Sequence, residues 1–249
     1  MSIPLRTAAV VVAGSGADRI ARIAGELGRL PVDEVYVVCP GSARETIDAA
    51  RRYGAKVVEA GDSPSQGEAI ALGVAQCRWA DAILCTSGRF VYPAAWLRPH
   101  LAAHLEGADV VLNDISSLPI PMSPLALYAA FLNCACGAVH AGSNSLMFFP
   151  FSLSRRAVER IGVERLARLP VALVTAHLEG LRVDAVGPVP GWATDPYLAL
   201  DDEEPAAAHA EALRLLEEHL AALAELVDVR GPRGSFSDHN RRRDLLGEG

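Results

Sequence analysis

The sequence predicts an α/β protein with a mainly parallel β-sheet flanked by helices, and three observations support this prediction. Short, continuous apolar runs, typical of strands buried on both faces, recur along the first 115 residues. Segments with apolar residues at helical spacing lie between these runs. The turns after the runs are short and rich in glycine, proline and serine. Such alternation favours right-handed crossovers and brings the carboxyl ends of the strands to one edge of the sheet.

The first half of the chain is expected to hold strands that alternate with helices. After the glycine turn at 14–16, Ile20, Ile23 and Leu27 recur at helical spacing. Ser42 is expected to cap the next helix, with Glu45 completing a capping box. Further helices are expected around residues 69–74 and 96–105. The expected strands are residues 7–13, 35–38, 56–59, 82–85 and 108–112.

The second half is less regular and richer in proline and glycine. Helices are expected at about 125–136, from 154 and across 166–178, and strands at 146–149 and 181–186.

A long helix is expected over residues 201–229, followed by a basic tail, 230–249. The acidic run at its start suits the positive end of a helix dipole. The apolar positions alternate by three and four, which favours a helix docked on the body, with a dimer seam as the alternative. These positions are His209, Leu213, Leu216, Leu220, Leu223 and Val227.

Composition limits the class of protein. The 249 residues are 51% hydrophobic and 21% charged, which is enough to bury a sizeable core. The net charge of −7 and the pI of about 5.5 argue against a nucleic-acid partner. No apolar run reaches the ~18 residues of a membrane helix, and the first residues lack the layout of a signal peptide. A cytoplasmic protein without a membrane span is therefore expected.

Cysteines and short motifs point to no common cofactor. The five cysteines lie in apolar contexts, which favours reduced core thiols. Cys134 and Cys136 with His140 form only a weak metal pattern. A Walker A loop, a complete dinucleotide fingerprint and a Gly-x-Ser-x-Gly elbow are all missing from the sequence.

The order of elements resembles a known family. The stretch from VVVAGSGADRIARIAGEL to DAILCTSGRFVYP is similar to the nucleotide-sugar half of the inverting family-two glycosyltransferases, which have the GT-A fold. The matching features are a Val-Val-x-x-Gly-Ser turn at 37–42, a helix ending in ARRYGAKVV, and Gly67 before the next helix. The later stretches ADVVLNDIS and GSNSLMFFPFSLSRRAVERIG resemble the following strand and the acceptor side. The resemblance covers about two-thirds of the chain.

The resemblance implies a GT-A-like domain over 1–200, with a nucleotide-binding half at 1–115 and an acceptor half at 116–200. It implies a nucleotide-diphosphate sugar and an unknown acceptor as partners. The apolar stripe of the C-terminal helix leaves a homodimer possible. Two alternatives stay open. One is an inactive binding or scaffold protein on the same fold. The other is a nucleotidyltransferase, although GSGADRIAR supplies no lysine to a phosphate loop.

Several positions depart from the family's pattern. Ala13, Ser15 and Gly16 stand where the family has a proline and an Asn-Glu turn, and Cys39 replaces an aspartate that commonly reads the uracil ring. The family's Asp-x-Asp, which holds Mg or Mn against the diphosphate, corresponds to Ser87-Gly88-Arg89. The segment RLARLPVALVTAHLEG has no Glu-Asp pair of the kind found near the family's catalytic base.

Arg89 therefore has three interpretations. A guanidinium can bind phosphate oxygens in a bidentate fashion and replace the cation, which gives a metal-independent transferase. Loss of the metal motif can instead indicate a scaffold, and a surface arginine in a turn is the third possibility. No metal ligand is predicted, although Mg or Mn would be the family's usual cofactor.

Other candidate residues complete the predicted site. Asp114 follows the fifth strand and is the best carboxylate to accept a proton from the acceptor hydroxyl, although strand-end aspartates often only cap turns. Asn113 and Asn144 are candidate acceptor ligands. The remaining candidates are donor or phosphate ligands, namely Ala13, Ser15, Cys39 and Ser87 at strand ends, Gly41 and Ser42 at a helix start, Gly67, and Arg241, Arg242 and Arg243 of the tail.

Overall fold

The computed structural model describes residues 5–13, 16–40, 43–61, 64–118, 123–189 and 205–231, with 205–212 described by their backbone alone. Its centre is a seven-stranded sheet with the order β3-β2-β1-β4-β6-β5-β7. Strand β6 runs antiparallel to β4 and β5, and the other pairs are parallel. The strands are β1 (Thr7–Val12), β2 (Glu34–Pro40), β3 (Lys56–Ala60), β4 (Ala82–Ser87), β5 (Val110–Asn113), β6 (Phe151–Ser154) and β7 (Val183–Val186).

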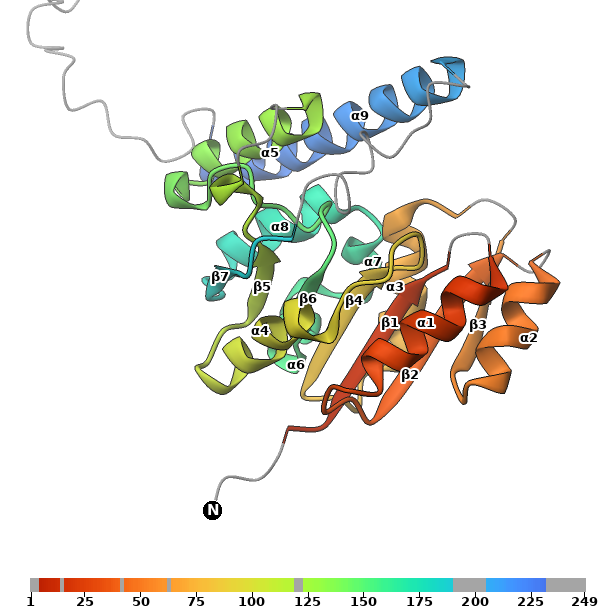
Figure 1. Cartoon of the computed structure of the whole chain (residues 1–249). Coiled ribbons are helices and arrows are strands. Elements are labelled where there is room, and N and C mark those ends of the chain that lie inside the picture. The colour runs from red at the N-terminus through yellow and green to blue at the C-terminus, as the bar shows by residue number, and fades with distance from the viewer. Residues whose placement is uncertain are drawn as a thin grey trace, which may run out of the picture.

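Helices flank this sheet (Figure 1). Helices α1 and α2 pack against each other, while α3 packs against β1 and β2 on the face opposite to α1 (Figure 1). The α-helices are α1 (Ala17–Leu27), α2 (Arg44–Arg52), α3 (Gln66–Gln76), α4 (Ala94–Leu105), α5 (Pro124–Ala135), α6 (Arg155–Ile161), α7 (Val163–Leu166), α8 (Leu169–Leu178) and α9 (Pro205–Arg230). Two short 3-10 turns are η1 (Ile115–Ser117), which follows β5, and η2 (Val139–Ala141), which packs against α5.

Most predicted elements of the first half are confirmed. The apolar runs predicted as strands are buried strands of the sheet, and helices lie between them. Residues Ala8, Ala9, Val10 and Val11 of β1 are fully buried, as a strand covered on both faces requires. Strands β6 and β7, from the predicted acceptor half, complete the same sheet. The division into 1–115 and 116–200 remains a prediction.

The predicted strand at 146–149 is wrong. Residues 146–149 are buried but not in a strand, and β6 begins only at Phe151. The apolar run continues through Leu153, so its pattern alone does not locate the strand. Pro150 offers no N–H to a ladder, which agrees with pairing that starts after it.

The predicted helix over 166–178 is confirmed from Leu169 onward, whereas Leu166 ends a separate short helix. Helix α7 ends at Leu166 and α8 begins at Leu169. Between them Arg168 is non-helical, with φ −126° and ψ 89°. Pro170 at the start of α8 lacks an N–H, which an N-terminal helical position does not need.

Helix α9 is docked on the body, as predicted, but mainly through a face other than the predicted stripe, although Leu223 of that stripe also contributes. It packs on α8 and lies beside α5 (Figure 1). Its buried residues are Leu215, His219, Ala222 and Leu226. In the predicted stripe, Leu213 and Leu220 are 48% and 56% exposed, and His209 lies outside the described side chains.

No helix in the described ranges is both long enough and apolar enough to cross a membrane.

Candidate functional site

The strand order creates a switch point between β1 and β4. The chain continues from β1 to β2 and β3 on one side, and then returns to place β4 on the other side. A switch point of this kind leaves a crevice outside the carboxyl ends of the strands, where α/β proteins bind ligands. We call this end of the sheet the carboxyl edge. Val12 and Ser87 pair there as neighbours across the switch point.

The turn after β4 projects Arg89 from the carboxyl edge. The Gly88 N–H donates to the Val12 carbonyl at 2.6 Å, which ties the turn to β1. The Arg89 N–H donates to Ser87 Oγ at 3.1 Å and closes the turn. The Arg89 side chain is exposed, and its guanidinium has no partner among the described residues. Arg89 is therefore available to an anion at the carboxyl edge.

Asp114 lies at the same edge, at the end of β5. Its half-buried carboxylate accepts a hydrogen bond from Asn144 Nδ2, with a distance of 3.2 Å to Oδ1. One strand, β6, separates β4 from β5, so at ~4.8 Å per strand the ends of β4 and β5 lie about 10 Å apart.

A hydrogen-bond network around the buried Asn144 holds it in place. Asn144 is 2% exposed, and its Oδ1 accepts from both the N–H and the hydroxyl of Ser116 at 3.1 Å. Asn133 Nδ2 donates to the carbonyls of Gly142 and Asn144 at 2.8 and 2.9 Å. Gly142 has φ +52°, and a Cβ there would lie 2.5 Å from Ser116 Oγ. The side chain of Asn144 thus has one orientation, with its amide directed at Asp114.

Sequence reasoning missed Ser116 and Asn133 in this network. Asn133 lies within a helix, and Ser116 lies in a short turn after β5. The only sequence signal was the polar run Gly142-Ser-Asn-Ser145 in an otherwise apolar region.

Asn113 is at the carboxyl edge but faces inward. Its side chain is fully buried, and its amide donates to the carbonyls of Phe149 and Val189 at 3.3 Å. Its Oδ1 accepts from the Val189 N–H at 2.8 Å. Both amide donors are therefore used within the protein, and the geometry favours a structural role over binding of a sugar.

Ala13 and Cys39 lie beside each other at the edge. The Ala13 N–H donates to the Val38 carbonyl at 2.8 Å, which places Ala13 level with the end of β2. Cys39 is 1% exposed, and burial raises the pKa of its thiol, so it is neutral near pH 7. It therefore cannot replace the carboxylate that reads a uracil ring in the family.

Gly67 has a packing reason to be glycine. A Cβ at this position would lie 2.2 Å from the Ala167 carbonyl oxygen, so α3 and α7 can approach only without a side chain there. The neighbouring Gln66 Nε2 donates to the Met147 carbonyl at 3.1 Å. Ser65 and Glu68 form a capping box that begins α3.

Some predicted residues lie outside the described part of the chain. These are Ser15, Gly41, Ser42, Arg241, Arg242 and Arg243. Helix α2 begins at Arg44, with Ala43 at its N-cap position, so the predicted cap by Ser42 is displaced by one residue.

The residues after β4 do not fit a divalent cation. Mg²⁺ and Mn²⁺ prefer carboxylate oxygens, whereas this turn offers a hydroxyl, a glycine and a guanidinium. Within the described ranges, no three His, Cys, Asp or Glu side chains are grouped so that they could hold a metal. Cys134 is exposed, while Cys136 is buried with its pKa raised to about 11 by burial.

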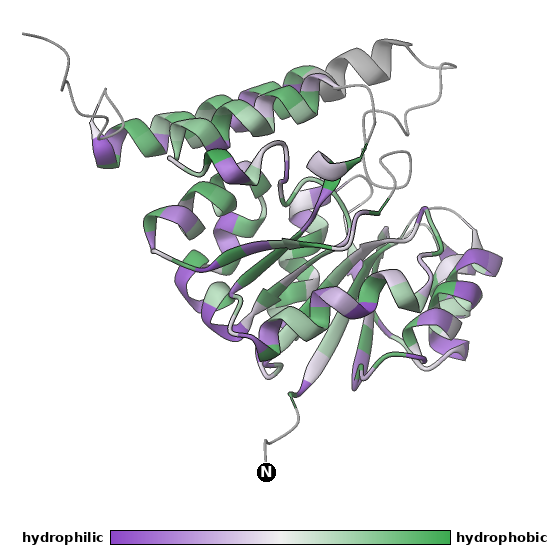
Figure 2. Ribbon diagram, turned by 60° about the vertical axis from the view of Figure 1, so that its left-hand side comes forward, coloured by the Kyte–Doolittle hydropathy of each residue, from purple (hydrophilic) through white to green (hydrophobic). Residues whose placement is uncertain are grey.

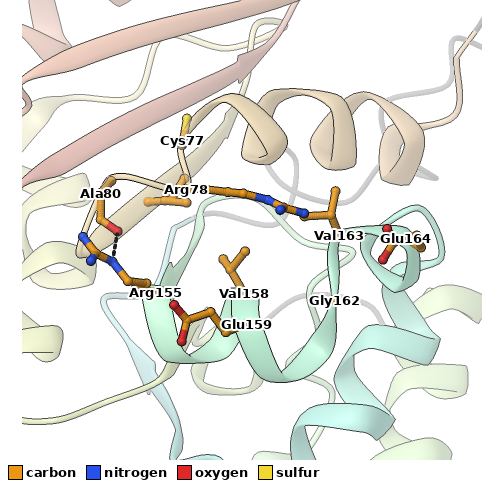
Figure 3. A pocket seen from close by; sticks show the side chains of 10 residues that line it. Cys77, Arg78, Ala80, Arg155, Val158, Glu159, Gly162, Val163 and Glu164 are labelled. Atoms are coloured by element: carbon orange, nitrogen blue, oxygen red, sulfur yellow. Dashed lines mark hydrogen bonds between the residues drawn. The ribbon is translucent and has the colours of Figure 1, made fainter.

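A separate pocket of about 340 Å³ lies away from this edge, between the end of α3 and α6 (Figure 3). Arg78 extends across it toward Val163, and Arg155 donates to the Ala80 carbonyl at its side (Figure 3). Glu159 and Glu164 also line the pocket, so it presents charges of both signs.

The sheet order, the single antiparallel strand within it and the C-terminal helix define a GT-A-like fold, the architecture of nucleotide-diphospho-sugar transferases. Solved structures with this fold include glucosyl-3-phosphoglycerate synthase from Mycobacterium tuberculosis in complex with Mn²⁺, uridine diphosphate and glucosyl-3-phosphoglycerate. The chain matches it with a TM-score of 0.62 and 16% identity over 88% of this chain and 80% of that one.

Two further structures agree. The same synthase with Mn²⁺, uridine diphosphate and phosphoglyceric acid matches with a TM-score of 0.61 and 17% identity, covering 94% of this chain and 80% of that chain. A mycobacterial protein matches with a TM-score of 0.65 and 16% identity, covering 88% of this chain and 75% of that chain. No protein-family model matches the chain, and no curated protein matches its sequence. At these identities the likeness shows the fold.

Proposed function

We propose that the protein is a glycosyltransferase that takes a sugar from a nucleoside-diphosphate donor without a divalent cation. The observation that carries this proposal is Arg89, an exposed guanidinium in the turn after β4, beside the switch point of a GT-A-like sheet. A guanidinium there can neutralise the diphosphate that a cation neutralises elsewhere, through charge-assisted bidentate hydrogen bonds. Uridine diphosphate is the first donor nucleotide to test, because it is bound in the similar synthase structures.

Asp114 is proposed as the general base. In an inverting transfer its carboxylate accepts the proton of the acceptor hydroxyl while that oxygen forms a bond to the anomeric carbon. The bond from this carbon to the diphosphate breaks at the same time, and the departing diphosphate is stabilised by Arg89. Asn144, fixed by Ser116, orients the carboxylate.

Gly41, Ser42 and the tail arginines remain proposed ligands of the donor. Gly41 and Ser42 would offer backbone N–H groups near the start of α2, where the helix dipole favours an anion. Arg241, Arg242 and Arg243 would add positive charge if the tail approaches the diphosphate.

Titration calorimetry with UDP-glucose and GDP-sugars tests this proposal. We expect one nucleotide sugar to bind, and Arg89→Ala to weaken that binding by about 10- to 100-fold, because a hydrogen bond to a charged group contributes about 1.5–3 kcal/mol. Arg78→Ala is the matched control, since Arg78 is also exposed but lies at the separate pocket. Wild-type protein that binds no nucleotide sugar would instead support the scaffold alternative.

A further inference from the structure

Helix α9 carries two apolar faces. One contains Leu215, His219, Ala222 and Leu226 and is buried against the body. The second contains Leu213, Leu216, Leu220, Leu223 and Val227, of which Leu213 and Leu220 are about half exposed. At ~100° per residue, the second face is rotated by about 110° from the first. Docking to the body therefore leaves part of this second face exposed, at Leu213 and Leu220, while Leu216, Leu223 and Val227 are half-buried.

The second face of α9 borders α5. Leu223 packs against the small apolar cluster that contains Leu132 of α5. Arg230 donates to the Cys136 carbonyl just after α5, with a distance of 2.8 Å. On the opposite edge of α9, Glu225 forms ion pairs with Arg165 and Arg168 near α7 and α8. The exposed stripe is thus continuous with the outer surface of α5.

Helix α5 extends this apolar surface. Its sequence, PLALYAAFLNCA, contains no charged residue, although the helix lies at the surface. Leu127 and Phe131, one turn apart, are 55% and 62% exposed. Absence of charge together with exposed aromatic and aliphatic side chains is typical of the centre of a protein interface. In Figure 2 these two helices form the top layer, and hydrophobic residues run along much of it.

We propose that this α5–α9 surface binds a second copy of the chain, so that two α5 and two α9 helices form a four-helix layer about a two-fold axis. Helices of 12 and 26 residues are about 18 and 39 Å long at ~1.5 Å per residue. At a width of about 10 Å each, they offer roughly 570 Å² before side-chain relief is counted. That approaches the ~800 Å² per partner of a standard interface.

Charge favours this partner over a lipid surface. Exposed Glu217 and Asp228 lie on the outer side of α9, three turns apart, and acidic side chains there are repelled by anionic lipid headgroups. The same two residues would repel their copies if two α9 helices met along that side. Because α5 is uncharged, α9 of one copy can cross α5 of the other without that repulsion.

Multi-angle light scattering after size exclusion tests the proposal directly. We expect the wild-type chain to have twice its 26.3 kDa mass, and Phe131→Glu and Leu220→Glu each to return it to 26.3 kDa. Both side chains are more than half exposed, so the variants should keep their circular dichroism spectrum. The control is Leu105→Glu on α4, which is 68% exposed outside this surface and should remain dimeric.

Three results would overturn the proposal. The first is a wild-type chain that is monomeric up to about 100 μM, far above the dissociation constant of a stable dimer. The second is a dimer that persists in both glutamate variants. The third is a monomer that cosediments with phosphatidylglycerol vesicles, which would assign this surface to lipid.

Discussion

At the amino edge of the sheet, where the parallel strands begin, an aspartate precedes each of β2, β4 and β5 and is bonded to its neighbours. Asp33 accepts from the Thr7 N–H at 2.7 Å, and Asp81 accepts from Arg155 at 2.7 Å. Asp109 accepts from Arg156 at 2.9 Å. At the carboxyl edge, Arg89 instead projects into solvent and Asp114 keeps a half-buried carboxylate.

The charged groups at the two edges therefore have different roles. Those at the amino edge stabilise the fold, whereas Arg89 at the carboxyl edge is left to bind a ligand. Charges at the amino edge have partners within the protein and hold strand ends together. For example, the Arg6 N–H lowers the pKa of Asp81 by a direct hydrogen bond. The one charge-bearing turn described after β4 leaves its guanidinium for an outside partner. Open α/β sheets bind ligands at the carboxyl ends of their strands, so this division agrees with the proposed donor site.

The largest expected effect is at the carboxyl edge, in Asp114→Asn. Loss of a general base typically costs about 10²- to 10⁴-fold in rate, and the amide preserves the shape of the side chain. We expect this fall in kcat for release of nucleoside diphosphate from the donor that binds in calorimetry, with donor affinity nearly unchanged. Asp48→Asn, at an exposed position of α2, should retain full activity. Equal activity in both variants would remove Asp114 from the mechanism.

As the pH falls, we expect the buried His100 to reduce the stability of the fold before the interactions of Asp81 at the amino edge are lost. Burial lowers the pKa of His100 from 6.5 to about 4, so between these values the unfolded chain binds the extra proton. Stability should therefore fall as the pH falls from about 6.5 to 4, by up to about 3 kcal/mol for this residue. The contribution of Asp81, whose pKa is lowered below 3.8, should persist through that window and be lost at lower pH.

Urea unfolding at several pH values measures this effect. His100→Gln should show a smaller decrease of unfolding free energy between pH 6.5 and 4 than the wild type. An identical decrease would show that His100 is not responsible.

A smaller effect is expected at the amino edge, in Asp109→Ala. The change removes the acceptor of Ser154 Oγ, Arg156 and the Arg182 N–H. We expect unfolding free energy to fall by about 2 kcal/mol, since Arg156 is largely exposed and water replaces part of the lost interaction. Donor affinity should stay unchanged, and a loss of affinity without a loss of stability would contradict the division between the edges.

The parts of the fold that were predicted correctly are those with a clear hydrophobic pattern in the sequence. Strands β1 and β4 are uninterrupted apolar runs between turns, so their ends, and with them Ser87 and Arg89, could be placed at one edge. The run from 146 to 153 is interrupted by Pro150, after which β6 begins, and the strand was misplaced because it was predicted on the wrong side of this proline. In α9, the docked face includes His219 and Ala222, which are weak hydrophobic signals, so the exposed leucine stripe was taken as the contact.

The site was less predictable than the fold. Asp114 could be placed at the carboxyl edge because it follows a strand, but its contact with Asn144 joins residues 30 apart through an irregular segment. Hydrophobic periodicity in the sequence does not predict contacts between residues so far apart. The packing role of Gly67 depends on the Ala167 carbonyl, 100 residues away, which only the structure places beside it.

The affinity for UDP-glucose measured with EDTA and with excess manganese tests the central claim most directly. If Arg89 replaces the cation, the two dissociation constants of the wild type should agree within about twofold, and Arg89→Ala should weaken binding in EDTA by about 10- to 100-fold. Binding that requires manganese and is unchanged in Arg89→Ala would contradict the account.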